Sequence, residues 1–361
     1  MLATVVSPAV AASVPALNPQ ALQAAIDDLR NPPATSAQLR VSGSAGQWYG
    51  TSGVADTSTG APICADGEFR IGSVTKVFVA TVVLQLVAEH RVDLDTPIQH
   101  YLPGLLPASF KPITVAELLN HTSGLPNEVG KPDMSDPATV VAHRYDQFTP
   151  LQLVAAIPDT QLKFDPGTKQ EYRGINYVLA AMLVEKVTGH HYGDEIAARI
   201  LRPLRLTHTV VPGNDPAIHG PHVHGYLDVP GQGLVDITDF NQSAAWGEGE
   251  MISTTGDLDR FVTALFSGAL LPPSTLEKMF TLPSSDVRMV DGGPASYSMG
   301  LQTITLNGVT VWGKTGERYG YNAAVFATRD QQRRLEYSFT PTHRDDTQVQ
   351  MTLRIAQAAT S

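Results

Sequence analysis

The longest apolar segment of the chain predicts a buried helix. Residues 74–90 read VTKVFVATVVLQLVAEH and are apolar on nearly every side of a helix, which is the pattern of a helix enclosed by protein. Residues 18–30 (NPQALQAAIDDLR) differ, because they begin with an asparagine N-cap and a proline and carry a single apolar stripe. The two patterns predict one helix inside the molecule and one on its surface.

Strand-like segments occur near both ends of the chain. Toward the N-terminus they are AQLRVSG (37–43), GQWYGTSGVAD (46–56) and EFRIGS (68–73). Toward the C-terminus they occupy 297–316 and 321–330, and residues 347–359 have the pattern of a closing helix. Between about residues 93 and 256, helices and loops are punctuated by proline. We therefore expect an α/β fold in which both chain ends build one sheet with flanking helices, and a mostly helical lobe is inserted between them.

No Gly/Ser linker or charge block divides the 361 residues, so we expect one catalytic unit of two lobes. Residues 18–92 and 257–361 would form the sheet lobe, residues 93–256 the helical lobe, and the site would lie between them. Residues 1–17 are apolar with an Ala-rich end but lack a basic start. We interpret them as the remnant of a secretory signal, with a disordered tail as the alternative. This favours an extracytoplasmic location, with the cytoplasm as the alternative.

Composition and charge exclude several classes of protein. A hydrophobic content of 42% excludes collagen, coiled coil and disorder. The net charge of −10 argues against nucleic acid and anionic membranes as partners, because both require a positive surface. Beyond the N-terminal segment, no stretch reaches the roughly 18 apolar residues that span a membrane. Cys64 is the single cysteine, so no internal disulfide can form. We expect a monomer.

A serine and a lysine stand at the start of the predicted buried helix. If Ser73 begins the helix, Lys76 lies one turn further on the same face. Burial disfavours the charged form of a lysine, so its amine can accept or relay a proton from the serine hydroxyl. The free N–H groups at a helix start also favour a developing oxyanion. A serine and a lysine at this spacing arise by chance about once in a chain of this length, so the pair needs further support.

That support comes from other segments. VWGKTGERYGYNAAVF carries Lys314, Thr315 and Gly316, and FDPGTKQEYRGINYVLAAML carries Tyr172 just before a predicted helix. Together with LLNHTSGL (118–125) and MISTTGDLDRFVTALFSG (251–268), these segments resemble the penicillin-recognising serine hydrolases. The resemblance runs from about residue 37 to 358. It is strongest to the branch of class C β-lactamases and D-alanyl-D-alanine carboxypeptidases, which also includes esterases, D-amino-acid amidases and acyltransferases.

The resemblance implies a β-lactamase-like fold and a set of catalytic roles. Ser73 would be the nucleophile that forms an acyl-enzyme, with Lys76 beside it. Tyr172 would be the general base, its phenol acidified by Lys76 and Lys314, because an ordinary tyrosine is too weakly ionised to serve. The backbone N–H groups of Ser73 and Glu317 would form the oxyanion hole. Thr315 and Gly316 would line the substrate-binding strand. No cofactor or metal is implied.

Two departures from the family pattern concern substrate recognition. The second motif usually reads Tyr-x-Asn, whereas here Gly174 follows Tyr172 and Arg173. The asparagine holds the acyl-side amide and touches the first lysine, so its loss removes a substrate hydrogen bond worth about 1 to 3 kcal/mol. Second, Glu317 follows the Lys-Thr-Gly motif where the carboxypeptidases carry a hydroxyl.

The anion-binding arginine of the carboxypeptidases also has no counterpart in this chain. Gln302 stands on the preceding strand where the arginine is expected. The segment WGEGE, with Trp246, Glu248 and Glu250, approaches the same cleft by the resemblance, although a solvated acidic loop is the alternative reading. These features predict an acidic pocket for a neutral or cationic amine or alcohol. Pairing of Arg318 with Glu317 would weaken that prediction.

The histidines form weaker candidate sites. His219, His222 and His224 lie close together, but we interpret their segment as a surface loop rather than a metal site. We expect His121 to be a structural residue of the helical lobe. His190 and His191 stand at a helix end, where histidines commonly meet exposed carbonyls. No Gly-x-Ser-x-Gly elbow or phosphate loop is present.

Two classes of function remain. The first is a serine acyl-enzyme hydrolase or acyltransferase for a small or peptide-like amide or ester, with an amine as a candidate acceptor and a leaving group that lacks a free carboxylate. Within this class, a D-alanyl-D-alanine carboxypeptidase or class C-like β-lactamase is the alternative. The second is an inactive binding or sensor protein on the same fold. The presence of all four residues Ser73, Lys76, Tyr172 and Lys314 favours an enzyme.

Overall fold

A computed structural model describes residues 14–130 and 132–361. Most of the predicted signal remnant, residues 1–13, lies outside this part of the chain. Within the described residues, none of the helices is both long enough and apolar enough to cross a membrane.

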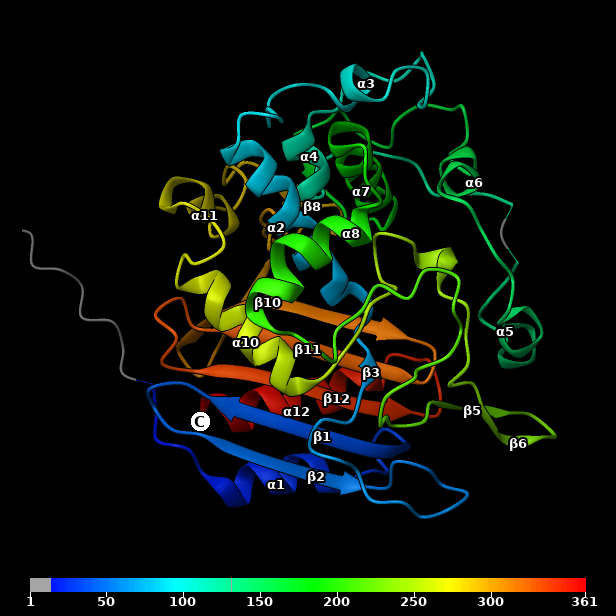
Figure 1. Ribbon diagram of the computed structural model, residues 1–361, viewed down its shortest axis with the longest axis vertical. Coiled ribbons are helices and arrows are strands. Elements are labelled where there is room, and N and C mark those ends of the chain that lie inside the picture. The colour runs from blue at the N-terminus through cyan, green and yellow to red at the C-terminus, as the bar shows by residue number, and fades with distance from the viewer. Residues whose placement is uncertain (1–13, 131) are drawn as a thin grey trace, which may run out of the picture.

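One six-stranded antiparallel sheet is built from both ends of the chain, as predicted (Figure 1). Its strand order is β2-β1-β12-β11-β10-β9. The strands are β1 (Ala34–Ser42), β2 (Trp48–Gly53), β9 (Gln302–Leu306), β10 (Val309–Arg318), β11 (Tyr321–Ala327) and β12 (Arg334–Pro341). The two chain ends meet where β1 pairs with β12, for example at Leu39 and Tyr337. The expected α/β fold is thereby confirmed.

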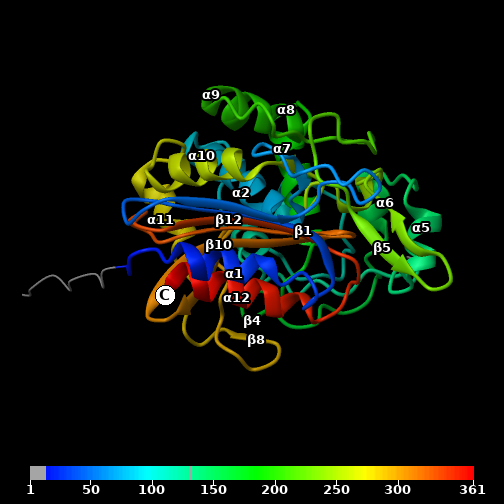
Figure 2. The same cartoon turned by 90° about the horizontal axis from the view of Figure 1, so that it is seen from below.

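Two helices from opposite chain ends cover one face of the sheet (Figure 2). They are α1 (Pro19–Asp27) and α12 (Gln348–Thr360). The Asn18 side chain accepts a hydrogen bond from the Ala21 N–H at 3.1 Å, so the predicted N-cap is present. An apolar cluster fills the space between these helices and the sheet, and it includes Leu22, Ile26, Leu39, Phe339 and Ile355.

The other face carries the helix predicted to be buried. A 3₁₀ turn (Gly72–Val74) leads into α2 (Thr75–Ala88), which packs against α7 (Ile175–Thr188). The rings of Phe78 and Phe261 stack at 3.8 Å and join α2 to α10 (Thr255–Phe266). Helix α11 (Pro273–Met279) also packs on α2.

The inserted region is mostly helical; residues 98–119 and helix α7 lie beyond α2 from the sheet, whereas residues 226–236 lie beside the sheet (Figure 1). Its remaining helices are α3 (Ile98–Tyr101), α4 (Val115–Leu119), α5 (Pro137–His143), α6 (Pro150–Ala155), α8 (Tyr192–Ile196) and α9 (Arg202–Leu204), with a π-helical turn (Ala197–Leu201) and a 3₁₀ turn (Ser243–Ala245). Short strand pairs lie outside the main sheet: β3 (Phe69–Arg70) with β7 (Ile252–Ser253), β4 (Lys169–Gln170) with β8 (Arg288–Met289), and β5 (Tyr226–Val229) with β6 (Gly233–Asp236).

The segment EFRIGS differs from its sequence pattern, because only Phe69 and Arg70 form a strand and they pair with β7 outside the main sheet. The chain leaves the strand at once to begin the turn that carries Ser73.

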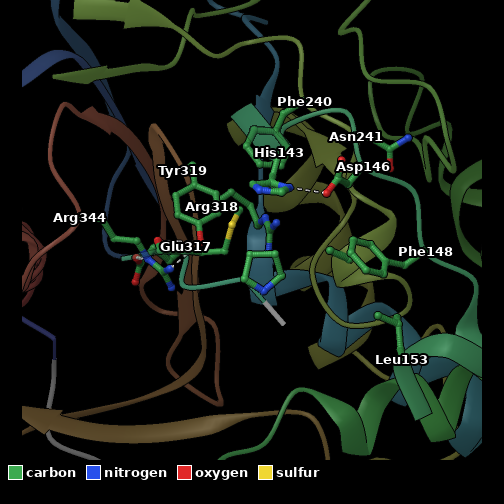
Figure 3. A pocket seen from close by; sticks show the side chains of 13 residues that line it. His143, Asp146, Phe148, Leu153, Phe240, Asn241, Glu317, Arg318, Tyr319 and Arg344 are labelled. Atoms are coloured by element: carbon green, nitrogen blue, oxygen red, sulfur yellow. Dashed lines mark hydrogen bonds and ion pairs between the residues drawn. The ribbon is translucent and has the colours of Figure 1, made fainter. Parts of the chain in front are cut away.

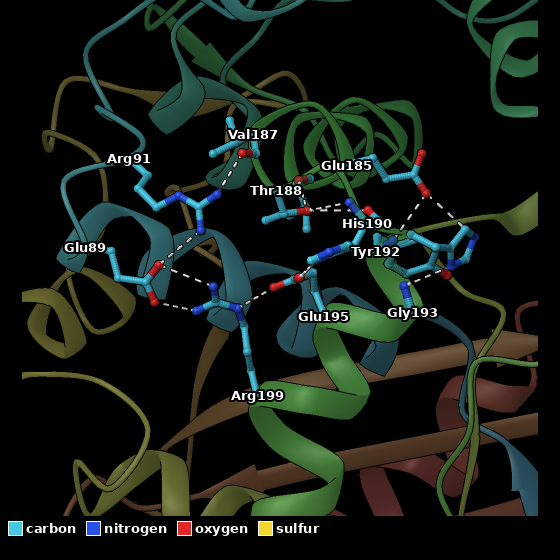
Figure 4. Close-up of polar contacts among 12 residues, drawn as sticks. Glu89, Arg91, Glu185, Val187, Thr188, His190, Tyr192, Gly193, Glu195 and Arg199 are labelled. Carbon is cyan, nitrogen blue, oxygen red and sulfur yellow. Dashed lines mark hydrogen bonds and ion pairs between the residues drawn. The ribbon is translucent and has the colours of Figure 1, made fainter.

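Charged side chains link the ends of three helices (Figure 4). Arg199 binds Glu89, at the end of α2, and Glu195, on α8, with N···O distances of 2.5 and 2.6 Å. Arg91 donates to the Val187 carbonyl of α7 at 2.7 Å. Such partly exposed pairs contribute little stability each, but together they hold α2, α7 and α8 in one arrangement behind the site.

Candidate active site

The predicted nucleophile lies where the 3₁₀ turn passes into α2. Lys76 stands one helical turn beyond Ser73, and its Nζ donates to Ser73 Oγ at 3.0 Å. Gly72 has a φ of +50°, and a Cβ there would lie 2.4 Å from the Glu317 backbone nitrogen. A glycine is therefore required for strand β10 to approach the nucleophile turn.

Tyr172 and Lys314 complete the predicted group. The Tyr172 hydroxyl donates to Ser73 Oγ at 2.6 Å. Its ring centroid lies 5.1 Å from Lys76 Nζ and 4.6 Å from Lys314 Nζ. Lys314 is buried on β10 and donates to the Thr315 carbonyl at 2.9 Å. The structure thus brings together all four residues predicted to be catalytic.

Strand β10 also contacts the backbone of the nucleophile turn. A Cβ on Gly316 would lie 1.9 Å from the Ile71 carbonyl oxygen and 2.9 Å from the Ser73 nitrogen. The next residue of the strand is Glu317, whose nitrogen faces Gly72. The two backbone N–H groups predicted to form an oxyanion hole therefore come from segments in direct contact.

Burial shifts the pKa values of Lys76, Lys314 and Tyr172, the three ionisable residues predicted to act with Ser73. It lowers the pKa of Lys76, an effect that the adjacent Glu248 carboxylate partly opposes. Burial and the Lys76 charge lower the pKa of Lys314 to about 7. Burial also raises the pKa of Tyr172 above its ordinary value. The predicted acidification of Tyr172 is therefore not supported, because burial disfavours the charged phenolate.

Glu248 lies among the residues predicted to be catalytic and contacts Lys76. Lys76 Nζ donates to the Glu248 carbonyl oxygen at 2.6 Å and to its Oε2 at 3.1 Å. A Cβ on Gly174 would lie 1.8 Å from Glu248 Oε2. The carboxylate therefore occupies the space that a side chain at position 174 would fill.

Trp246 and Glu250, the other aromatic and acidic residues of the segment WGEGE, are buried inside the protein. Trp246 is buried and its ring lies 4.8 Å from that of Tyr192, so its predicted role in substrate binding is not supported. Glu250 is fully buried and accepts a hydrogen bond from the Tyr192 hydroxyl. Burial raises the pKa of Glu250 to about 7. The alternative reading of this segment as a solvated acidic loop is therefore wrong.

The end of β10 is less acidic than the sequence indicated. Glu317 Oε1 accepts from Arg344 Nε at 2.5 Å, so its ion-pair partner is Arg344 rather than Arg318. Arg344 follows β12 and is remote in sequence, which is why the pair was not foreseen. Gln302 begins β9 opposite Gly313, four positions along β10 from Glu317.

A cavity of about 330 Å³ opens at this end of the strand (Figure 3). Glu317, Arg318 and Arg344 line one side of it, and Phe148, Leu153 and Phe240 line the apolar side. His143 and Asp146 also line it, with 2.6 Å between His143 Nδ1 and Asp146 Oδ2. The cavity combines an apolar wall with both signs of charge, which differs from the purely acidic pocket that was predicted.

Two rings beside Tyr172 were not assigned to the site from sequence. His121 is buried, its ring centroid lies 4.5 Å from that of Tyr172, and its Nδ1 accepts from the Arg173 N–H at 3.2 Å. Burial and the two lysines hold the pKa of His121 well below its usual range, so the ring is neutral. Tyr297 lies 5.2 Å from Tyr172 between ring centroids. The HTSGL segment of the family pattern could have placed His121 in the site. No sequence pattern indicated Tyr297.

Other histidines are bound to single carboxylates. His219 contacts Asp215 and His224 contacts Asp236, each at 2.7 Å. His190 contacts Glu195 at 2.7 Å, rather than a helix carbonyl. Among residues 14–130 and 132–361, no group of three or more His, Cys, Asp or Glu side chains could hold a metal ion.

Comparison with known proteins gives the same family throughout. A solved D-stereospecific amidohydrolase from Streptomyces sp. is 34% identical, with a TM-score of 0.82 over 95% of this chain and 98% of that one. D-amino acid amidase from Ochrobactrum anthropi SV3 is 26% identical, with a TM-score of 0.77 over 94% and 98% of the two chains.

Curated relatives include penicillin-binding protein 4* of Bacillus subtilis, 26% identical over 79% of this chain and 63% of its own length. A putative D-alanyl-D-alanine carboxypeptidase of Escherichia coli is 25% identical over 60% of this chain and 56% of its own length. The chain thus spans about three fifths of the length of these curated relatives. The family described as "Beta-lactamase" matches residues 23–360. This chain belongs to the β-lactamase family.

Proposed function

We propose that this protein is a serine amidohydrolase that forms an acyl-enzyme on Ser73 and acts on amides and esters of amino acids, D-amino acid amides in particular. The observation that carries the proposal is the environment of Ser73 Oγ. It accepts hydrogen bonds from Lys76 Nζ at 3.0 Å and from the Tyr172 hydroxyl at 2.6 Å. A serine between a buried amine and a phenol is an activated nucleophile.

The substrate class is supported by the relatives that match over nearly their full length, a D-stereospecific amidohydrolase and a D-amino acid amidase. An amino acid amide releases ammonia, a leaving group that lacks a carboxylate. Such a leaving group needs no arginine to bind it, and Gln302 stands where the carboxypeptidases carry one. The apolar wall formed by Phe148, Leu153 and Phe240 suits an aromatic or aliphatic substituent.

The proposed acylation begins with attack of Ser73 Oγ on the substrate carbonyl carbon. The hydroxyl proton moves to neutral Lys76, the group in contact with Ser73 whose pKa is lowered by burial. This differs from the assignment of Tyr172 as general base, because the pKa of Tyr172 is raised. The backbone N–H groups of Ser73 and Glu317 stabilise the oxyanion.

Collapse of the tetrahedral intermediate breaks the bond to the leaving nitrogen. Tyr172 donates its hydroxyl proton to that nitrogen and recovers a proton from Lys76, which returns to its neutral form. Water or an amine then attacks the ester carbonyl carbon on Ser73 by the same route in reverse. An amine that binds beside the ester competes with water because its position is already held.

The alternative is a penicillin-binding protein with carboxypeptidase or β-lactamase activity, which the curated relatives favour. That reading requires a group to bind the acyl-side amide, and Gly174 has no side chain to offer. Penicillins and D-alanyl-D-alanine peptides should therefore turn over more slowly than the roughly 10 per second typical of enzymes. Steady-state hydrolysis assays with both substrates measure this directly.

The nucleophile can be tested by intact mass after incubation with a fluorophosphonate probe. The unmodified protein should gain one adduct, Ser73→Ala should gain none, and the exposed Ser58→Ala should label like the unmodified protein. Labelling of Ser73→Ala at the normal rate would place the nucleophile elsewhere. Complete lack of labelling in the unmodified protein, together with lack of hydrolysis, would favour an inactive binding protein.

A further inference from the structure

The carboxylate of Glu248 stands where the chain lacks a side chain at position 174. A Cβ built on Gly174 would meet Glu248 Oε2 at 1.8 Å, Cδ at 2.3 Å and Oε1 at 2.5 Å. The two residues therefore compete for one volume. Gly174 begins helix α7, whereas Glu248 belongs to the loop before β7, so the polar group reaches the site from a different segment.

The loop that carries Glu248 is held in place by buried contacts. The Gly247 N–H donates to Glu250 Oε1 at 3.1 Å and to the Tyr192 hydroxyl at 3.2 Å. The Glu248 and Gly249 N–H groups both donate to the Ala245 carbonyl, at 3.0 and 2.9 Å. Gly247 has a φ of +70° and would place a Cβ 2.7 Å from that of Ala181. The carboxylate is thus positioned before any substrate binds.

Glu248 also orients the amine of Lys76. Neutral Lys76 has two N–H groups and one lone pair, and it faces three oxygens: Ser73 Oγ, the Glu248 carbonyl and Glu248 Oε2. When both N–H groups donate to Glu248, the lone pair faces Ser73 Oγ, which is the geometry for proton acceptance. The carboxylate is therefore a positioning group for the proposed proton acceptor.

The same carboxylate can reach a bound substrate. Its side chain is 23% exposed, while that of Lys76 is 1% exposed. Because Lys76 Nζ lies 3.0 Å from Ser73 Oγ and 3.1 Å from Glu248 Oε2, these two oxygens are at most about 6 Å apart. In an attacked amino acid amide the carbonyl carbon lies about 3 Å from the nucleophile, and the amino nitrogen about 2.5 Å further. That nitrogen can therefore lie within hydrogen-bond distance of the carboxylate.

The chemistry of the Glu248 carboxylate limits which substrate groups it can bind. An ionised carboxylate only accepts hydrogen bonds, whereas the asparagine of the usual motif both donates and accepts. An acyl-side carbonyl, such as that of an N-acylated substrate, finds no donor here. An α-ammonium group supplies both a donor and a complementary charge, and such charge-assisted bonds are the stronger ones.

We propose that Glu248 replaces the missing side chain at position 174 and selects substrates whose acyl group carries a free α-amino group. This rests on the proposed function, since it concerns the acyl group transferred to Ser73. The substrate class is then amides and esters of unblocked amino acids.

Three amides test the selection in the full chain: D-phenylalanine amide, its N-acetyl derivative, and 3-phenylpropanamide, which lacks the amino group. D-phenylalanine amide should have a kcat/KM about 10- to 100-fold above the other two, the range of one charge-assisted hydrogen bond. Glu248→Gln should reduce this ratio to within a few-fold. Glu277→Gln, which removes an exposed carboxylate on α11 that pairs with Arg329, should retain the ratio.

The outcomes separate the inference from the proposed function. Equal turnover of the three amides, with an acyl adduct on Ser73, would overturn the role of Glu248 and leave the serine mechanism intact. Absence of any adduct on Ser73 during turnover would overturn both. If the selectivity ratio is unchanged in Glu248→Gln, a group other than Glu248 binds the α-ammonium group.

The shared volume predicts a rescue that a purely structural residue would not show. Gly174→Asn alone should impair acylation, because its side chain and the Glu248 carboxylate cannot both fit. Combined with Glu248→Ala, it should regain acylation relative to either single variant, with selectivity shifted toward N-acetyl-D-phenylalanine amide. A double-mutant cycle of kcat/KM measures this coupling. Additive losses would show that the two positions do not share a site.

Discussion

One face of the six-stranded sheet is packed mainly through apolar contacts, whereas the other buries ionisable groups. Between the sheet and helices α1 and α12, Leu22, Leu39 and Phe339 are fully buried in an apolar cluster. On the opposite face, which α2 covers (Figure 2), Lys76 and Lys314 are almost as deeply buried, and the Tyr172 ring lies close to both amines. The same sheet therefore supports two kinds of interior.

Burial on the first face stabilises the fold, whereas burial on the second adjusts the acidity of the site residues. Apolar burial on the α1 and α12 face stabilises the fold by about 25 cal/mol per Å². Burial on the α2 face instead lowers the pKa of both lysines, which costs stability and makes an amine able to accept a proton. Substitutions on the two faces should accordingly affect different measurements.

The largest effect is expected from Ser73→Ala. Loss of the nucleophile should reduce kcat on an amide substrate by about 10³- to 10⁶-fold, as removal of a covalent nucleophile does in serine enzymes. The melting temperature should change little, because one hydroxyl is lost without a cavity. Kinetics and thermal unfolding of the same preparation check both statements. Near-normal turnover would exclude the acyl-enzyme mechanism.

Leu39→Ala should show the opposite result on the apolar face. Leu39 is fully buried in the middle of strand β1, so its truncation should destabilise the protein by about 2 to 5 kcal/mol. Below the unfolding transition, kcat should stay close to that of the unmodified protein. Denaturant unfolding gives the first quantity, and assays at low temperature give the second. A large loss of kcat in the folded variant would couple the two faces.

Glu250→Gln should change how stability depends on pH. The pKa of Glu250 is raised from 4.5 to about 7 in the folded protein, so the folded state binds more protons between these values than the unfolded chain. Stability from this group is complete below pH 4.5 and is lost as pH rises through 7, by at most about 3 kcal/mol. The variant should lack this part of the pH dependence. Parallel curves for the two proteins between pH 5 and 8 would contradict it.

The smallest expected effect is a shift in the pH dependence of kcat. Activity should rise with pH as Lys76 loses its proton, below the ordinary lysine pKa, because burial lowers its pKa. The Glu248 charge opposes that lowering, so Glu248→Gln should move the rising limb to lower pH. Lys314 and Arg318 face the same region and remain unchanged in this comparison. A shift to higher pH would show that Glu248 acts on another group.

Local patterns predicted much of the site. Ser73 and Lys76 are neighbours because residues three positions apart lie on the same face of a helix. Outside the site, Asn18 and Pro19 predicted the residue at which α1 begins. The strand patterns at both chain ends predicted a single sheet, because apolar strands must be buried against each other. Tyr172 and the Lys-Thr-Gly motif were assigned to the site from the family resemblance. No local sequence pattern predicts that residues 73, 172 and 314 lie close together.

Only the tertiary structure decided the features that depend on distant neighbours. The Glu248 carboxylate takes the volume left by Gly174, and Arg344 rather than Arg318 pairs with Glu317. The pKa of Tyr172 is raised, because the surrounding chain desolvates its phenol. Helical spacing and caps involve residues a few positions apart, so the sequence determines them by itself. Shared volume, ion-pair choice and desolvation depend on segments more than 20 residues apart, so they exist only once the chain is folded.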